Sequence, residues 1–294
     1  MIEKHRKTIA LVFLLLIFGG CLAFFSGRDS NQETEGALEP LKVTVFKVGK
    51  ADAIVLQTGK ETMVIDAGEE EDGEEIVEFL ENQNLSKVDV LIITHFDRDH
   101  VGGADTLVEK MEIGRVLIPA YQGGNTEYMD FMNALEQKEL SPQQLIRPEK
   151  FEFGEAVVSV EPPASYELAE DILEYDNNFS LITSVTHGEN KLLFMGDAQK
   201  ARIREWLEGE SAEPYDFLKV PHHGVYDTAL KELLLEVQPE YAVICSSKKN
   251  PADAGTLELL SEKGVRTFQT KDGNITVISD GKTLELRQEL ERER

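Results

Sequence analysis

The sequence predicts an α/β (α+β) fold arranged as a four-layer αββα sandwich, with two mixed sheets face to face and helices on both outer faces. Two observations lead to this prediction. From residue 41 onward, short β-type runs alternate with segments of helical periodicity. Each half of the chain opens with β-hairpins and continues with β-α units, so each half can form one sheet with its own helical cover.

The first half opens with three β-type runs joined by tight turns, which are LKVTVFKV, AIVLQT and TMVIDAG. Apolar residues at helical spacing follow between Glu74 and Gln83. The run VDVLIITH is apolar almost throughout, which is typical of a strand buried on both faces. A helix from about Gly103, the strand RVLIPA and a helix over residues 125–139 complete this half.

The second half repeats this order. The runs FSLITSVTHG and NKLLFMGDA predict a hairpin that turns around Gly188–Asn190. Helices are expected over residues 201–209, 228–237 and 254–264, and the last of these ends at a glycine. Strands are expected at the start of DFLKVPHHG, in YAVICSS, and in the closing runs VRTFQT, NITVISD and KTLELR.

Residues 1–25 are interpreted as a signal peptide or membrane anchor, because the basic stretch KHRK precedes an apolar run. The tetrad FGGC resembles a lipobox, in which Cys21 would be lipidated. Alternatively, the apolar run Ile9–Phe25 is an uncleaved anchor near the lower length limit for crossing a bilayer. A cleaved secretory signal is the third choice. We therefore expect the rest of the chain to be extracytoplasmic and, on the first two readings, attached to the cell membrane.

The remaining organisation is a polar linker over residues 26–40, a folded domain over residues 41–288 and a charged tail over residues 289–294. The chain has 30 Lys and Arg against 55 Asp and Glu, for a formal charge of −25, and this charge repels phosphate backbones. A nucleic-acid partner would need metal ions or a local basic patch. Two cysteines imply no disulfide framework, and no protein partner can be inferred.

The stretch ITHFDRDHVGG follows a predicted strand and carries His95, Asp97, Asp99 and His100 within six positions. Other polar residues stand at other predicted strand ends, and they are Asp66, Asp197, His222 and His223. Imidazoles and carboxylates are ligands for zinc, manganese and iron. Crowded carboxylates in a partly buried loop are costly without a cation. Four ligands so close in sequence suit two ions about 3.5–4 Å apart better than one.

These motifs resemble the metallo-β-lactamase fold superfamily, through HxDxDHxGG, the earlier IDAG, the later LLFMGDA and PHHG. The HxDxDH form, together with VFKVGKADAIVLQT, DNNFSLI and KVPHHG, is similar to the extracytoplasmic hydrolase domain of the ComEC/Rec2 DNA-uptake proteins over roughly residues 41–287. The resemblance implies the αββα sandwich and two divalent metal ions, zinc or manganese.

The resemblance also implies roles for individual residues. His95 and Asp97 would hold the first ion. Asp99 and His100 would hold the second ion, with His223 as its third ligand, although the neighbouring His222 is an alternative. Asp197 would bridge both ions. Further polar residues would contact the ligands or the substrate, and they are Asp66, which would accept an imidazole N–H, Asp52, Asn177, Asn178 and Ser180.

The sequence departs from the family pattern at several places. Asp97 stands where the superfamily usually has a histidine, and Asp176-Asn177-Asn178 where it has a third ligand for the first ion. KVGKADA replaces the usual DVGQGDA, and Val225 replaces the serine of PHHGS. These departures bear on the substrate more than on the metal.

The function we expect is an extracytoplasmic hydrolase of the phosphodiesterase or nuclease type, acting by metal-activated hydroxide. Asp99 would orient the nucleophile, and His222 would act as an acid or a substrate contact. The substrate would be DNA or an envelope polymer such as a teichoic acid. One alternative is a carboxyl ester, thioester or lactone hydrolase, and another is a catalytically weakened protein that binds DNA or an envelope polymer. A role in competence would need a partner, because one apolar segment cannot form a pore.

Overall fold

The structure is a computed structural model that describes residues 38–166, 175–209 and 211–289. The expected signal or anchor, with its lipidation site at Cys21, lies outside these residues. So do most of the expected linker and most of the charged tail. In the described part of the chain, helices fall short of the length and apolar character that a membrane crossing requires.

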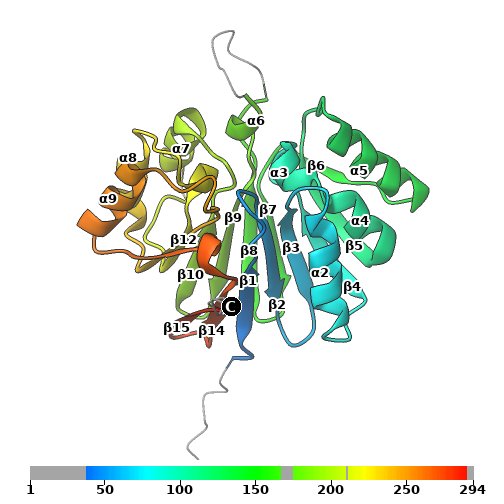
Figure 1. Cartoon of the computed structure of the whole chain (residues 1–294), viewed down its shortest axis with the longest axis horizontal. Helices are drawn as coiled ribbons and strands as arrows, with labels where there is room; N and C mark the ends of the chain where they lie inside the picture. Colours follow the sequence, from blue (N-terminus) through cyan, green and yellow to red (C-terminus); the bar gives the residue numbers. More distant parts are fainter. Residues whose placement is uncertain (1–37, 167–174, 210, 290–294) are drawn as a thin grey trace, which may run out of the picture. The chain divides into compact units, whose positions relative to one another are not determined.

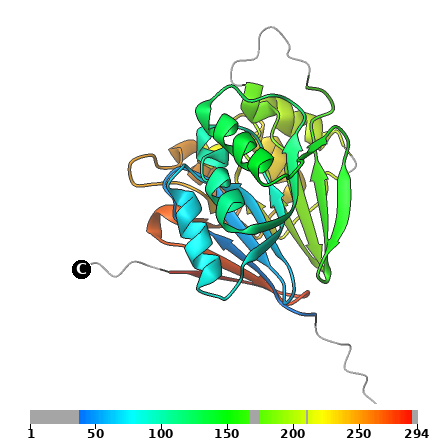
Figure 2. The ribbon, with the colours of Figure 1, turned by 90° about the vertical axis from the view of Figure 1, so that its right-hand side faces the viewer.

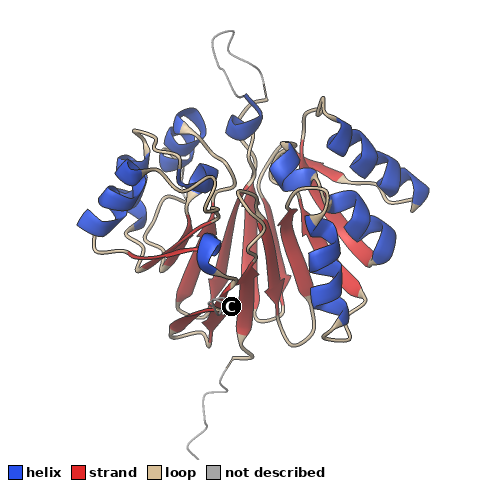
Figure 3. Cartoon of the chain, in the orientation of Figure 1, coloured by secondary structure: helices blue, strands red, loops and turns tan. Residues whose placement is uncertain are grey.

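Two large sheets form the centre of the domain (Figures 1 and 3). The first sheet has the spatial order β15 (Leu284–Gln288), β14 (Ile275–Ser279), β1 (Leu41–Val45), β2 (Ala53–Gln57), β3 (Thr62–Ala67), β4 (Lys87–Ile92), β5 (Glu112–Pro119) and β6 (Gln143–Leu145). The second has the order β13 (Arg266–Gln269), β12 (Tyr241–Ile244), β11 (Phe217–Lys219), β10 (Asn190–Phe194), β9 (Ile182–His187), β8 (Ala156–Glu161) and β7 (Glu149–Phe153).

Helices cover the outer face of each sheet, and Figure 2 shows the helices of the first half from the side. Those on the first sheet are α2 (Asp72–Glu81), α4 (Ala104–Lys110) and α5 (Thr126–Gln137). Those on the second sheet are α7 (Lys200–Leu207), α8 (Leu230–Val237) and α9 (Ala254–Glu262). Shorter helices lie in connecting segments, and they are α3 (Arg98–Val101), α6 (Tyr175–Asn178), η1 (Pro221–Gly224) and η2 (Thr270–Asp272).

Three apolar layers hold these elements together, one between the sheets and one under each group of helices. Strand β2 shows how one strand serves two layers. Its Ile54 and Leu56 point between the sheets, while Ala53 and Val55 pack under the helices, because successive side chains of a strand alternate in direction. The predicted four-layer αββα sandwich is therefore confirmed.

Two features of the sheets differ from a simple division into halves. The closing hairpin β14–β15 returns to the first sheet, where Val277 pairs with Val43 of β1 in antiparallel register. Strands β6, β7 and β8 were not predicted. In β7, with the sequence EKFEF, only Phe153 is fully buried, so its polar and charged residues gave a weak β signal.

Parallel pairing brings the carboxyl ends of distant strands to one edge of the sandwich. In the first sheet β3, β4 and β5 run parallel, and in the second β10, β11 and β12 run parallel. The polar motifs noted above follow β3, β4, β10 and β11 in the sequence. The fold therefore gathers them from four strand ends.

The two glycines after His100 allow the chain to approach its neighbours closely. A Cβ built on Gly103 would lie 2.4 Å from the Gly73 nitrogen and 2.6 Å from the Ala67 oxygen, and both are backbone atoms. A Cβ on Gly102 would lie 2.7 Å from backbone atoms of Glu69 and Glu70. Backbone atoms cannot yield as a flexible side chain does. These glycines hold the helices after His100 against the loop that follows β3.

We expect Gly103→Ala to lower the free energy of unfolding by about 1–3 kcal/mol, because the added methyl group overpacks this contact. Gly124→Ala is a matched control, since a Cβ there meets nothing within 4 Å, and it should change stability by no more than about 0.5 kcal/mol. Urea denaturation followed by circular dichroism measures both. Equal midpoints for the two variants would contradict the close packing described here.

Candidate metal centre

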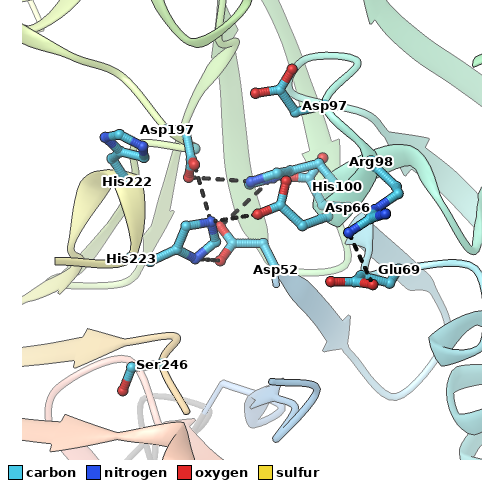
Figure 4. A network of polar contacts seen from close by, with 12 residues as sticks. Asp52, Asp66, Glu69, Asp97, Arg98, His100, Asp197, His222, His223 and Ser246 are labelled. Carbon is cyan, nitrogen blue, oxygen red and sulfur yellow. Dashed lines mark hydrogen bonds and ion pairs between the residues drawn. The ribbon is translucent and has the colours of Figure 1, made fainter. Parts of the chain in front are cut away.

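Acidic and imidazole side chains converge where the strand ends meet (Figure 4). Three overlapping groups each place their candidate ligand atoms within 4.8 Å of one another. These groups are His95, His100 and Asp197; Asp99, His100 and His223; and Asp52, Asp66 and His100. All of these residues are buried except Asp99, which is partly exposed. The predicted metal ligands are thus brought together with one exception, Asp97. His222, predicted as an acid, a substrate contact or an alternative ligand, also lies outside these groups.

Asp66 organises the histidines that follow β4. One of its carboxylate oxygens accepts the Thr94 backbone N–H at 2.7 Å. The other accepts the Thr94 hydroxyl at 2.7 Å and lies 2.8 Å from His100 Nδ1. Since Thr94 donates its only hydroxyl proton to Asp66, it accepts from His95 Nδ1, 3.0 Å away. When neutral, both imidazoles therefore carry their proton on Nδ1, which leaves the lone pair of each Nε2 for a cation.

A second buried pair, Asp52 and Lys219, supports the other side of the centre. The Lys219 ammonium contacts the Asp52 carboxylate, donates to the Gly196 oxygen at 3.2 Å and lies 3.7 Å from Asp197 Oδ1. Asp52 Oδ1 lies 3.5 Å from His223 Nδ1. Burial raises the pKa of Asp52, but the neighbouring Lys219 ammonium and the imidazoles outweigh burial and lower it. Asp52 is therefore an anion that faces His223.

His223 and Asp197 meet at the middle of the group. His223 Nε2 lies 3.0 Å from Asp197 Oδ2 and 3.3 Å from Asp99 Oδ2, and His100 Nε2 lies 3.2 Å from Asp197 Oδ1. Burial lowers the pKa of His100, but the Asp197 and Asp66 carboxylates outweigh it and raise that pKa well above its ordinary value. In the absence of another cation, the carboxylates therefore favour protonation of the neighbouring imidazoles.

The donor atoms fit a divalent cation. Several buried atoms at this point have no hydrogen-bond partner within the described structure, and they are His95 Nε2, His100 Nε2, both ring nitrogens of His223, Asp52 Oδ1 and Asp197 Oδ1. Buried polar atoms are normally paired, so a set left unpaired at one point calls for a ligand. Imidazole nitrogen with carboxylate oxygen is a donor set suited to zinc or manganese.

The backbone is strained at this edge. Asp66, His222 and His223 have positive φ values of 56°, 48° and 53°, a region that residues with a Cβ seldom adopt. Such strain persists where surrounding structure holds it, and it concentrates at functional sites. Here it turns the Asp66 and His223 side chains toward the same point (Figure 4).

The two neighbouring histidines have different surroundings. His223 is 2% exposed and points toward Asp197, whereas His222 is partly exposed and is directed away from the other ligands (Figure 4). His222 Nδ1 lies 3.3 Å from the Gln199 amide nitrogen, which can only donate. Neutral His222 therefore carries its proton on Nε2. The geometry favours His223 over His222 as the ligand.

Asp97, predicted as a ligand, lies at the periphery. It is absent from the three groups, its side chain is 41% exposed, and its Oδ2 lies 3.6 Å from His95 Nε2. Asp176 lies beside it, and Asp176 Oδ1 is buried without a hydrogen-bond partner. Burial, with the Asp97 charge next, raises the pKa of Asp176. A further group of donors, His95, Asp97 and Asp176, thus forms on the outer side of the centre.

The remaining predicted residues, Asn177, Asn178 and Ser180, lie in the segment before β9, and two of them hydrogen-bond to the chain after β10. Ser180 accepts the Asp197 backbone N–H through its hydroxyl at 3.2 Å, and Asn178 accepts the Arg202 backbone N–H at 3.1 Å. Asn177 is 4% exposed, and its amide oxygen has no hydrogen-bond partner. The buried Arg202 side chain donates to the Ser180 oxygen at 3.1 Å. Ser180 and Asn178 therefore act on Asp197 and α7 through the backbone.

Sequence reasoning missed Thr94 and Lys219 and gave no role to Asp176. Lys219 did leave a signal, because a lysine inside the apolar run FLKV, directly before the histidine pair, must be paired when buried. Thr94 left none, since threonine is common in strands.

Comparisons with known proteins agree with this geometry. The Metallo-beta-lactamase superfamily model matches residues 47–169 and 176–248. ComE operon protein 3 from Bacillus subtilis is 26% identical over 205 residues, which cover 69% of this chain and 26% of that protein. Recombination protein 2 from Haemophilus influenzae is 25% identical over 185 residues, which cover 60% of this chain and 20% of that protein. The chain thus spans about a quarter and a fifth of their lengths.

Solved structures share the fold at low sequence identity. The metallo-beta-lactamase fold protein YhfI from Bacillus subtilis matches 79% of this chain and 96% of its own, with a TM-score of 0.50 and 12% identity. Igni18, a metallo hydrolase from Ignicoccus hospitalis, matches 81% of this chain and 98% of its own, with a TM-score of 0.50 and 14% identity. The family model covers more than half of the sequence, and the chain belongs to the metallo-beta-lactamase superfamily.

Proposed function

We propose that this chain is a hydrolase that uses two divalent metal ions, zinc or manganese, to cleave a phosphodiester. One observation carries the proposal. Buried ring nitrogens of His95, His100 and His223 converge with the Asp197 carboxylate within a few ångströms, and the imidazole–carboxylate contacts of 3.0 Å and 3.2 Å do not satisfy hydrogen-bond geometry. Such an arrangement is unfavourable unless a cation occupies it.

The donors divide between two ions. His95 and Asp97, with Asp176 beside them, would hold the first ion. Asp99, His100 and His223 would hold the second. Asp197 lies near both groups, because one of its oxygens is within 4.8 Å of a His95 ring nitrogen and Oδ2 lies 3.0 Å from His223 Nε2. Asp197 would therefore serve as a ligand to both ions.

When bound, such a pair of cations lowers the pKa of a water molecule toward about 7 and neutralises charge that develops on a phosphoryl group. The residues of the chain supply the rest. Asp66 keeps the His95 and His100 lone pairs pointed inward. Lys219 balances part of the carboxylate charge. His222, whose Nδ1 faces Gln199, would present its Nε2–H as a hydrogen-bond donor to the substrate.

The donor set supports a phosphodiester over a carboxyl ester. It is rich in carboxylates, which makes the centre hard and anionic and shifts its preference toward manganese. Two cations can bind both the entering and the leaving oxygen of an in-line displacement at phosphorus. A relative named Recombination protein 2 supports DNA as one candidate substrate, and an envelope polymer such as a teichoic acid remains the other.

The place of action is part of the proposal. The basic stretch and apolar run within residues 1–25 support an extracytoplasmic domain attached to the membrane by an anchor or by lipidated Cys21. Metabolic labelling with a radioactive fatty acid, comparing the natural chain with Cys21→Ala, separates lipidation from an uncleaved anchor.

His100→Ala and Asp197→Ala should each lower manganese- or zinc-dependent cleavage of bis(p-nitrophenyl) phosphate by more than about 100-fold, because each removes a ligand. Asp89→Asn is the control, since Asp89 accepts the Thr62 N–H at the far end of β4 and touches no ligand. Circular dichroism checks that each variant is folded. Metal-loaded protein that hydrolyses carboxyl esters or lactones but no phosphodiester would refute the substrate class.

Asp66→Asn should weaken metal binding by about 10–100-fold while the fold is kept. Both Asp66 oxygens accept hydrogen bonds from Thr94 or His100, and the amide nitrogen that replaces one of them can only donate. Competition with a chromophoric chelator measures the affinity without relying on turnover. Asp89→Asn again serves as the control. An unchanged affinity in Asp66→Asn would show that Asp66 does not position the ligands.

A further inference from the structure

A second polar pocket lies at the edge formed by the β1–β2 loop, the segment after β12 and η2. Its volume is about 310 Å³. The residues that line it are Lys47, Gly49, Ser246, Ser247, Lys248, Lys249 and Lys271. Four lysines therefore line one small pocket, together with two serines and a glycine that presents only backbone.

The charge of this pocket is opposite to that of the chain. The formal charge of the protein is −25, yet no aspartate or glutamate lines the pocket. One lining lysine has a carboxylate partner outside the lining, because an Asp272 oxygen lies 2.9 Å from Lys271 Nζ. Lysine ammonium groups that line one pocket repel one another, and an anion bound among them reduces this repulsion. Such a cluster in an acidic protein marks a site for an anion.

Hydrogen bonds fix the segments that carry the lysines. The Ser246 N–H donates to Thr270 Oγ1 at 3.0 Å, and that hydroxyl donates to the Ser246 oxygen at 3.2 Å. The Lys47 N–H donates to Asn274 Oδ1 at 2.7 Å. The Asn250 N–H donates to the Ser247 hydroxyl at 2.9 Å. The pocket is therefore built from three segments that are tied together.

Two segments of the chain contribute residues both to the pocket and to the surroundings of the metal centre. The β1–β2 loop carries Lys47 and Gly49 and then reaches Asp52, whose carboxylate faces His223. Ser246 follows Cys245, whose thiol lies next to the same Asp52 carboxylate. In Figure 4, Ser246 lies below His223 and Asp52, apart from the other labelled side chains. The lysine pocket thus adjoins the metal centre on the side that Asp52 occupies.

We propose that this lysine pocket binds a non-scissile phosphate of an extended phosphodiester chain whose scissile phosphate lies at the metal centre. This inference rests on the proposed function and narrows its substrate class to a polymer. The pocket has no aromatic lining on which a base could stack, so it contacts the phosphate backbone alone. Lysine recognises phosphate as a point charge, which suits this sequence-independent contact.

The test measures binding of a fluorescent oligothymidylate with phosphorothioate linkages, which resist hydrolysis, to the metal-loaded protein. The variant Lys248→Glu/Lys249→Glu changes two exposed lysines of the pocket. Lys60→Glu/Lys231→Glu makes the same change of charge at two exposed lysines elsewhere. Metal content and the thermal midpoint of each variant establish that the centre and the fold are intact.

We expect the pocket variant to bind about tenfold more weakly at low salt, with the slope of log K against log salt reduced by about 0.7–1.4, because one or two phosphate contacts are lost. The control variant should bind like the natural protein. Equal loss in both variants would show only an effect of net charge and would overturn the proposal, as would unchanged binding in the pocket variant.

Two further arms separate the possible failures. Cleavage of bis(p-nitrophenyl) phosphate by the natural protein tests the proposed function, while the binding measurement tests the pocket, so either can fail alone. Competition by an oligomer of glycerol phosphate identifies the source of the phosphate. If it displaces oligothymidylate through the same lysines, the pocket needs only the polyanion. If it does not compete, recognition extends beyond phosphate, and the backbone-only contact proposed here is overturned.

Discussion

The centre of this protein depends on the compensation of charge among buried carboxylates. Asp52, Asp66 and Asp197 are almost completely buried, and Asp99 lies against them with limited exposure. Within the described part of the chain, Lys219 is the one lysine or arginine that forms ion pairs with them. Burying like charges together is unfavourable without further positive charge, which protons on His100 and His223 or metal ions can provide. The unpaired imidazole and carboxylate atoms identify metal ions as the partners that fit.

The αββα sandwich positions these carboxylates and imidazoles next to one another. Parallel strands bring β3, β4, β10 and β11 to one edge, and the candidate ligands lie at or just after the ends of these strands. Gly102 and Gly103 let the loop that carries candidate ligands pack directly on the chain after β3, and Asp66, within β3, contacts the His100 imidazole. Strained backbone at Asp66 and His223 is kept because the packed sheets on both sides hold it. The packing of the two sheets therefore holds the side chains of the centre in one arrangement.

The sequence predicted the layers and the cluster of ligands, because both depend on local patterns. Buried strands such as β4 are nearly all apolar, and their polar ends stand out. The return of β14–β15 to the first sheet could not be predicted, since pairing partners of a hairpin are not encoded in its own periodicity. Asp97 and Asp176 show the same limit within the centre. Their positions in the sequence do not reveal that Asp97 lies at the periphery of the centre or that Asp176 lies beside Asp97.

The most direct test of the central claim is anomalous diffraction from crystals of residues 26–294 grown with manganese or zinc. The account predicts two anomalous peaks, one near His95 and one between His100 and His223, with Asp197 touching both. It is contradicted if the metal-soaked crystals show no anomalous density at this point and the imidazoles instead pair only with the carboxylates around them.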